Sequence, residues 1–290
     1  MIITAVAILG GVGLLFAILI ALANHKLKVW QDPRIEVVAG MLPGANCGAC
    51  GMPGCRAFAE KLVSGAAQPA GCNVANADGR AAIASYLGVD AGAAVKTVAR
   101  MLCAGGTNVA RLQAEYRGLP SCSAASAVAG GGKGCAWGCL GLADCVRSCT
   151  FDAMRMNADG LPVVDIEKCT ACGDCVEACP KDLLMIMPLD RTLLVQCRNL
   201  IAGDDVLDDC KVACTACGKC VVDAARGLIS VASGVAVIDY DLNNLADIHA
   251  IERCPTGAIV WLRGEQFAPS MSPGLPGRAR EARPHIGSAA

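Results

Sequence analysis

The sequence predicts an α+β protein in which small cysteine-rich modules follow one apolar N-terminal helix. Three observations predict this class. Residues 1–24 carry no charged side chain, twenty cysteines occur in closely spaced groups, and short apolar segments that alternate with polar residues separate some of these groups. Aromatic residues make up only 3% of the chain, so one large core is excluded. We therefore expect small modules stabilised by bound metal, because metal binding supplies folding free energy that packing here does not.

The cysteine groups divide the chain into six predicted segments. They are an apolar helix (1–24), a four-cysteine domain (25–76), a helical spacer (77–133), a module with two cysteine runs (134–190), a degenerate copy of that module (191–263) and a disordered tail (264–290). The tail is rich in Pro, Gly and Arg and has almost no periodicity. The formal net charge of −1 argues against a nucleic-acid-binding function.

Residues 1–24 are long enough to cross a membrane. As a helix they span about 35 Å, which exceeds the ~30 Å hydrocarbon core of a bilayer. A cleaved signal peptide is the alternative, since Ala21 and Ala23 are typical of a cleavage site, but no basic residue precedes the apolar run and the run is too long. We expect a retained, single-pass anchor in the cytoplasmic (inner) membrane. Lys26 and Lys28 follow directly, which predicts that the rest of the chain faces the cytoplasm.

The most regular motif is Cys169–Pro180, which reads C-T-A-C-G-D-C-V-E-A-C-P. The spacing C-x2-C-x2-C-x3-C-P is typical of [4Fe–4S] binding in bacterial ferredoxins, where the fourth cysteine, here Cys179, ligates a neighbouring cluster. A zinc ribbon is the alternative because it also uses C-x2-C. Zinc sites pair cysteines two by two, whereas three thiols fall in one run here, so the spacing favours iron–sulfur clusters.

The preceding run supplies the companions that Cys179 requires. It is Cys135-x3-Cys139-x5-Cys145-x3-Cys149. Thr150 replaces the usual proline, and Met154–Asp165, between the two runs, is a predicted β-hairpin that turns at Asp159-Gly160. The two-cluster ferredoxin plan predicts two ligand sets. They are Cys135, Cys139, Cys145 and Cys179 for one cluster, and Cys149, Cys169, Cys172 and Cys175 for the other.

The next module repeats this plan with half of its ligands missing. One set is retained, namely Cys214, Cys217, Cys220 and Cys254. Ala224 stands where a fourth ligand of the first run is due, and no second three-thiol run follows the hairpin predicted at Leu228–Tyr240, which turns at Ser233-Gly234. We therefore expect one cluster in this module.

An apolar stripe is expected to fill the volume of the missing cluster. Its members are spaced by three along a predicted helix and are Leu242, Leu245, Ile248 and Ile251. His249 is an alternative ligand, as histidine is in Rieske centres, but a surface or capping role is the simpler interpretation.

The N-terminal domain contains four cysteines with spacing C-x2-C-x4-C-x16-C. They are Cys47, Cys50, Cys55 and Cys72. Neighbouring glycines allow the backbone to turn closely around a cluster, although zinc is a stronger alternative here because the spacing alone is less diagnostic. The sequence thus predicts four [4Fe–4S] clusters and about sixteen irons.

The spacer and four remaining cysteines carry no predicted ligand role. Ala81–Met101 has apolar residues at helical intervals and is predicted to form one or two short helices. Cys103 and Cys122 are interpreted as small buried residues, and no metal is assigned to Cys197 and Cys210.

Taken together, the motifs resemble those of the B subunit of the Rnf complex, over about residues 1–263. The resemblance rests on Asp32-Pro33-Arg34, Leu42–Gly51, Cys103–Gly106, Cys135–Cys149 and Cys169–Pro180. It implies a membrane assembly that couples electron transfer between ferredoxin and NAD to sodium or proton transport. The implied partners are other membrane and peripheral subunits, soluble ferredoxin or flavodoxin, and membrane lipid.

The resemblance implies an electron-relay subunit of an oxidoreductase. The sequence shows no nucleophile, general base or nucleotide site of its own, and the predicted membrane helix has no ionisable residue, so ion translocation belongs to partner subunits. The lost ligand set argues against an electron path that needs a complete second module. Two alternatives remain, a redox-sensing or regulator-reducing iron–sulfur protein and a cluster-assembly scaffold.

Overall fold

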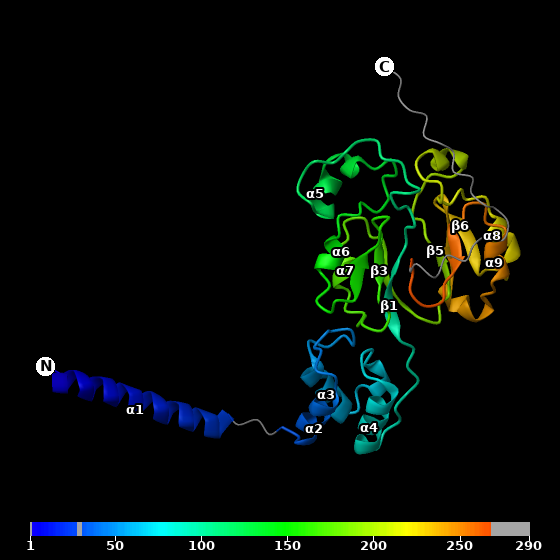
Figure 1. Cartoon of the computed structure of the whole chain (residues 1–290). Coiled ribbons are helices and arrows are strands. Elements are labelled where there is room, and N and C mark those ends of the chain that lie inside the picture. Colours follow the sequence, from blue (N-terminus) through cyan, green and yellow to red (C-terminus); the bar gives the residue numbers. More distant parts are fainter. Residues whose placement is uncertain (1, 28–30, 268–290) are drawn as a thin grey trace. The chain divides into compact units, whose positions relative to one another are not determined.

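A computed structural model describes residues 2–27 and 31–267, and most of the tail predicted from residue 264 lies outside the described residues. The chain forms two compact units. The first contains residues 1–46, 53–69 and 75–91, and the second contains residues 47–52, 70–74 and 92–290. Helices make up the first unit, and short strands and helices make up the second (Figure 1).

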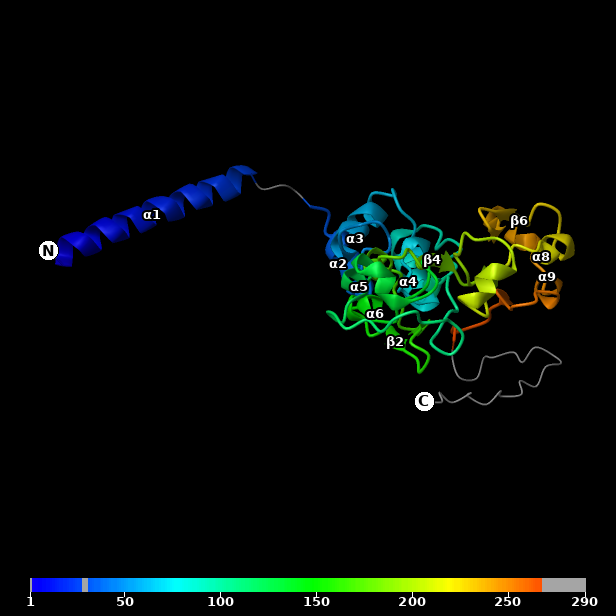
Figure 2. The same cartoon turned by 90° about the horizontal axis from the view of Figure 1, so that it is seen from above.

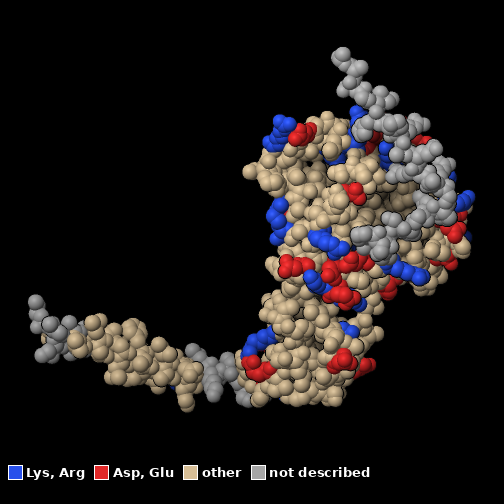
Figure 3. Space-filling view, in the orientation of Figure 1, with Lys and Arg blue, Asp and Glu red and all other residues tan. Residues whose placement is uncertain are grey.

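Helix α1 spans Ile2–Leu27. Among the described residues it is the one helix long and apolar enough to cross a membrane by length and composition, and none of its window Leu9–Lys26 is buried. Its visible face in Figure 3 carries no acidic patch, in keeping with a segment that contains no Asp or Glu. The predicted apolar helix is therefore present, and it extends three residues beyond the predicted end.

Three helices pack together in the rest of the first unit. They are α2 (Arg34–Met41), α3 (Cys55–Val63) and α4 (Ala77–Leu87). Helix α2 packs against both others, and Val38, Phe58 and Ile83 are almost completely buried. Helix α4 begins at an Asn76 cap, whose side chain accepts the Gly79 N–H at 2.8 Å, and ends at left-handed Gly88. A short 3-10 turn, η1, spans Pro69–Gly71.

Strand β1 (Thr97–Met101) corrects the prediction of helix up to Met101. The helical prediction holds for α4 and is wrong after Gly88, because the chain leaves the helix there and then pairs antiparallel with β4 (Leu184–Pro188), with Val98 opposite Met187. Long-range pairing and burial of this segment override a local pattern that fits either type of element.

The β1–β4 module joins this strand pair to a hairpin and short helices. Its other elements are α5 (Cys122–Ala127), η2 (Ala129–Gly132), α6 (Asp144–Arg147), β2 (Met154–Met156), β3 (Pro162–Val164) and α7 (Asp174–Glu177). Strands β2 and β3 form the predicted hairpin, in which Gly160 adopts a positive φ of 71° at the turn. The core includes Val98, Met101, Leu161, Val164, Leu183 and Leu184.

The β5–β8 module repeats this topology. Its elements are β5 (Leu193–Val195), η3 (Asp204–Asp208), α8 (Lys219–Asp223), β6 (Ile229–Ala232), β7 (Val235–Ile238), η4 (Tyr240–Leu245), α9 (His249–Glu252) and β8 (Ile259–Trp261). Strand β5 pairs with β8, and β6 pairs with β7 through the predicted turn at Ser233-Gly234, where both residues have positive φ. Helices α8 and α9 lie side by side in Figures 1 and 2.

The apolar stripe predicted after this hairpin is wrong as a single helix. The segment breaks into η4 and α9, and only Leu242 and Ile251 pack against the module core. Leu245 and Ile248 are 45% and 48% exposed. Ala250 lies in this core and is only 1% exposed, and Ala224 and Ala246 pack against it.

Candidate iron–sulfur sites

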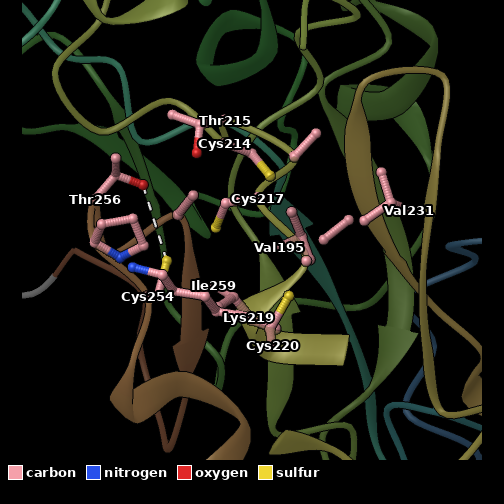
Figure 4. A pocket seen from close by; sticks show the side chains of 15 residues that line it. Val195, Cys214, Thr215, Cys217, Lys219, Cys220, Val231, Cys254, Thr256 and Ile259 are labelled. Carbon is pink, nitrogen blue, oxygen red and sulfur yellow. Dashed lines mark hydrogen bonds between the residues drawn. The ribbon is translucent and has the colours of Figure 1, made fainter. Parts of the chain in front are cut away.

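The retained cysteines of the β5–β8 module converge on one cavity. The cavity has a volume of about 380 Å³ and is lined by Cys214, Cys217, Cys220 and Cys254. Figure 4 shows their sulfur atoms facing a common space from α8 and the loops beside it. The Cys254 Sγ lies 3.8 Å from the Thr256 hydroxyl. The structure thus brings together the four residues that the sequence grouped.

A second cavity, of about 320 Å³, lies in the β1–β4 module. Its cysteines are Cys149, Cys169, Cys172 and Cys175, which is the set expected from the ferredoxin plan. Burial raises the pKa of Cys172, and a hydrogen bond from the Thr170 side chain, which lines the same cavity, opposes this effect. A hydroxyl aimed at a ligand sulfur fits a thiolate-bound group in this cavity, because such hydrogen bonds stabilise thiolate ligands.

A third cavity, of about 390 Å³, differs from the predicted set by one residue. Its cysteines are Cys122, Cys139, Cys145 and Cys179. The structure does not bring Cys135 to this cavity, where Cys122, interpreted from sequence as a small buried residue, takes the fourth place. The Ser121 hydroxyl and the Ser123 N–H both donate to the Asp144 carboxylate, at 2.9 and 3.0 Å, which ties the start of α5 to the start of α6.

The irregular spacing of the first cysteine run explains why Cys122 lines this cavity in place of Cys135. A C-x2-C spacing after Cys139 would place a thiol at residue 142, which is Leu142. The run therefore lacks one ligand at its usual position, and α5 supplies a thiol from a distant loop. The prediction of Cys135, the nearest cysteine, was wrong for this cavity, and Leu142 at the usual ligand position was the signal for a remote ligand.

The loops that lead into these cavities share one backbone conformation. In each, the residues two and four positions after the first cysteine are left-handed. The pairs are Gly141 and Ala143, Ala171 and Gly173, and Ala216 and Gly218. Left-handed alanines are strained, and such strain persists where the surrounding structure over-determines it, as at binding sites.

Burial makes these thiols poor anions on their own. It is the main cause that raises the pKa of Cys139, Cys145 and Cys175 to about 12, and neighbouring thiols add to it. The thiols are therefore protonated at neutral pH unless cationic metal compensates for their charge. Within the described residues, no three Cys, His, Asp or Glu side chains gather around a point that a single ion would occupy. Four thiols around a larger space suit a multi-iron group better than zinc.

The N-terminal ligand set stays a prediction from its spacing. Cys47, Cys50 and Cys72 belong to the second unit, and Cys55 begins α3 in the first. The Asn46 side chain accepts the Cys55 N–H at 2.8 Å.

His249 does not line the cavity of the β5–β8 module. It is 69% exposed and its Nδ1 lies 2.9 Å from a Glu252 carboxylate oxygen, as a surface histidine would.

Comparisons with known proteins agree with iron–sulfur chemistry. The model of a family described as a putative Fe–S cluster domain matches residues 42–74, and the model of a 4Fe–4S binding domain matches residues 161–184. These matches contain the four-cysteine motif and the regular run, respectively.

Curated relatives match most of the chain. The B subunit of the Na(+)-translocating ferredoxin:NAD(+) oxidoreductase complex of Acetobacterium woodii is 44% identical over 89% of this chain and 77% of the relative. The proton-translocating counterpart of Clostridium ljungdahlii is 35% identical over 86% and 88%, and the B subunit of an ion-translocating oxidoreductase complex of Methanosarcina acetivorans is 36% identical over 82% and 90%. The chain therefore belongs to the family of B subunits of Rnf-type, ion-translocating oxidoreductase complexes.

Proposed function

We propose that this chain is the membrane-anchored electron-relay subunit of an Rnf-type complex. It exchanges electrons with soluble ferredoxin, or flavodoxin, on the cytoplasmic side, and partner subunits translocate sodium ions or protons. Bound [4Fe–4S] clusters supply one-electron redox chemistry at potentials that hydrogen bonds and burial adjust. The observation that carries the proposal is the succession of four-thiol cavities within the second unit.

The proposed ligand sets follow the cavities, except for the N-terminal set, which follows the spacing. They are Cys47, Cys50, Cys55 and Cys72; Cys149, Cys169, Cys172 and Cys175; Cys122, Cys139, Cys145 and Cys179; and Cys214, Cys217, Cys220 and Cys254. These sets amount to four clusters, arranged in two ferredoxin-like modules and a four-cysteine motif.

Direct contacts support a short path between neighbouring sets. The Asn73 side chain, next to Cys72, donates to the Thr170 carbonyl at 3.0 Å and to the Thr97 carbonyl at 2.9 Å. This amide therefore joins the loop of an N-terminal ligand to the loop that carries Cys169 and Cys172. In the β1–β4 module, Cys145 on α6 and Cys175 on α7 belong to the same cluster of buried core residues.

Polar groups of the chain are placed to hold and tune these sites. The Leu183 N–H donates to the Cys179 sulfur at 3.4 Å. Arg100 on β1 is 1% exposed; burial lowers the pKa of its guanidinium, and the charge of nearby Cys169 opposes that effect. A buried cation beside a ligand set favours the more negative, reduced state of whatever the thiols hold.

Reduction by ferredoxin in the presence and absence of partners tests the proposal. In membranes that contain the complex, anaerobic reduced ferredoxin is expected to bleach the visible iron–sulfur absorption of this chain. The chain is also expected to copurify with flavin-containing membrane partners. A chain that purifies alone, loses its iron in air and accepts no electrons from ferredoxin would support the redox-sensor alternative instead.

A further inference from the structure

The four cysteines that remain outside these sets line a cavity of their own. Cys103, Cys135, Cys197 and Cys210 border a space of about 340 Å³ in the second unit. This volume lies within the 320 to 390 Å³ range of the three cavities described above. With this group included, every one of the twenty cysteines falls into a set of four.

A glycine is placed between two of these thiols. A Cβ at Gly105 would lie 3.3 Å from the Cys210 sulfur and 3.4 Å from the Cys103 sulfur, so the two sulfurs are no farther apart than the sum of these distances. The Gly105 N–H donates to the Cys103 sulfur at 3.4 Å. Any larger side chain at residue 105 would project between the thiols, which is a reason for glycine there.

Each of the other three thiols receives a similar backbone hydrogen bond. The donors are the N–H groups two residues further along, at Trp137, Asn199 and Val212. Hydrogen bonds from backbone N–H groups to sulfur stabilise thiolate ligands and adjust cluster potentials. Burial outweighs them in the free thiols, for it raises the pKa of Cys197 to about 11.

Backbone hydrogen bonds hold the four segments together. The Ala104 N–H donates to the Gln196 carbonyl at 3.1 Å, which joins the Cys103 and Cys197 segments. Ala110 forms an isolated bridge with Cys210, and the Gly134 N–H donates to the Arg111 carbonyl at 2.9 Å. The site is therefore organised by main-chain contacts and not by side-chain packing alone.

The two modules contribute equivalent ligands to this cavity. Cys103 follows β1 by two residues, and Cys197 follows β5 by two residues. Cys135 and Cys210 each precede the first cysteine of a run with C-x3-C spacing, before Cys139 and Cys214. The same two positions of a repeated module thus supply both halves of the set.

We propose that Cys103, Cys135, Cys197 and Cys210 ligate an additional [4Fe–4S] cluster at the junction of the β1–β4 and β5–β8 modules. The four thiols lose their protons as they ligate iron. Zinc is disfavoured, because no set of three potential ligands among the described residues is arranged around a single ion.

Contacts of this cavity reach two of the ligand sets described above. Lys133 lines this cavity and donates to the Gly105 carbonyl and to the Cys139 carbonyl, while Cys197 receives a backbone hydrogen bond from Cys214. The additional cluster would therefore lie between the Cys139 set and the Cys214 set. The role of this cluster as a link rests on the relay proposed above. The existence of the cluster does not depend on that relay.

Iron and acid-labile sulfide counts on the anaerobically purified full chain test the proposal. We expect about twenty of each per chain, and about sixteen in the double variant Cys103→Ser/Cys210→Ser, with loss of one set of EPR signals on reduction. Sixteen irons in the unmodified chain, an unchanged count in the variant, or a zinc ion that the variant loses would each overturn it.

A glycine pair provides a test that removes no ligand. Gly105→Leu is expected to lower the count by about four irons, because its side chain would extend from a Cβ that already lies 3.3 and 3.4 Å from two ligand sulfurs. Gly40→Leu, where nothing lies within 4 Å of the new Cβ, is the matched control and should keep all twenty. If the double variant does not fold, an unchanged count in Gly105→Leu still contradicts the proposal. A chain with twenty irons that takes no electrons from ferredoxin would reject the relay and leave the additional cluster standing.

Discussion

Two loops of the β5–β8 module occupy equivalent positions, ahead of α8 and ahead of α9, but differ in chemistry and backbone. The loop before α8 carries Cys214 and Cys217, and its Ala216 and Gly218 are left-handed, with φ of 55° and 73°. In the loop before α9, Ala246 and Ile248 have φ of −66° and −62°. The strained conformation thus occurs with the thiols and is absent without them.

The sheet of the module survives the loss of ligands. Strands β5 and β8 pair as β1 and β4 do, and Ala250 and Ala224 occupy positions where the β1–β4 module has Cys175 and Cys149. Small apolar residues therefore occupy two positions at which the β1–β4 module has cysteines. With the proposed ligand sets, the β5–β8 module depends on a single cluster, whereas the β1–β4 module would hold two.

Removing the ligand Cys220 is expected to have the largest effect. Cys220→Ala should cost about four irons and unfold much of the β5–β8 module, because metal contributes on the order of 10 kcal/mol to small metal-dependent domains. Cys175→Ala should cost as much iron but leave the β1–β4 module folded around its other cluster. Iron counts with hydrogen exchange across residues 97–188 and 193–261 measure both, and Ala224→Ser serves as control. Equal protection of both modules after either substitution would contradict this dependence.

In the β1–β4 module, the proposed ligand from a distant loop, Cys122, can be replaced by a cysteine at the usual spacing. Cys122→Ser should lose about four irons, and adding Leu142→Cys should restore them, because residue 142 is the C-x2-C position after Cys139. Iron counts and EPR of the two variants check the exchange. If Cys122→Ser keeps all its iron in this cluster, the cavity assignment fails.

Enlarging Ala250 tests how completely the volume of the missing cluster has been filled. Ala250→Leu should lower the free energy of unfolding by about 1–3 kcal/mol, because the residue is buried in a packed core. Val222→Leu, at a residue that is 77% exposed, should change it by less than about 0.5 kcal/mol. Denaturant titration of the iron-loaded chain compares them, and a neutral Ala250→Leu would show that space remains there.

The smallest expected effect is a change in stability that has opposite signs in the loops before α8 and α9. Ala216→Gly should stabilise the iron-loaded chain by about 1 kcal/mol, because glycine relieves the left-handed strain. Ala246→Gly, in a loop with negative φ, should destabilise it by a similar or smaller amount, through chain entropy. Thermal melts of the two variants should shift in opposite directions, and shifts of the same sign would contradict the conformational difference.

Local spacing made much of the site predictable from the sequence. In the sets containing Cys169 and Cys214, three cysteines lie close together in one segment and the fourth comes from the other run of the module. The ferredoxin spacing was therefore enough to group them. Both hairpins were marked by turn residues, and the structure confirms them.

Ligands from distant segments could not be predicted in this way. Cys122 reaches its cavity through contacts of α5 with Asp144, and Cys103 is positioned by β1, which local periodicity misassigned as helix. Both depend on long-range pairing. The sequence did contain one relevant signal, the C-x3-C spacing that begins at both Cys135 and Cys210. This spacing becomes informative only when the two modules are aligned with each other.

Anomalous iron scattering from crystals of the anaerobic full chain tests the central claim most directly. The account predicts iron in each of the four-cysteine cavities, with Cys122 and not Cys135 beside the Cys145 set. It predicts no iron beside Ala224 and Ala250. Iron next to these alanines, or a cavity at Cys214 without iron, would contradict the ligand sets on which the proposed relay depends.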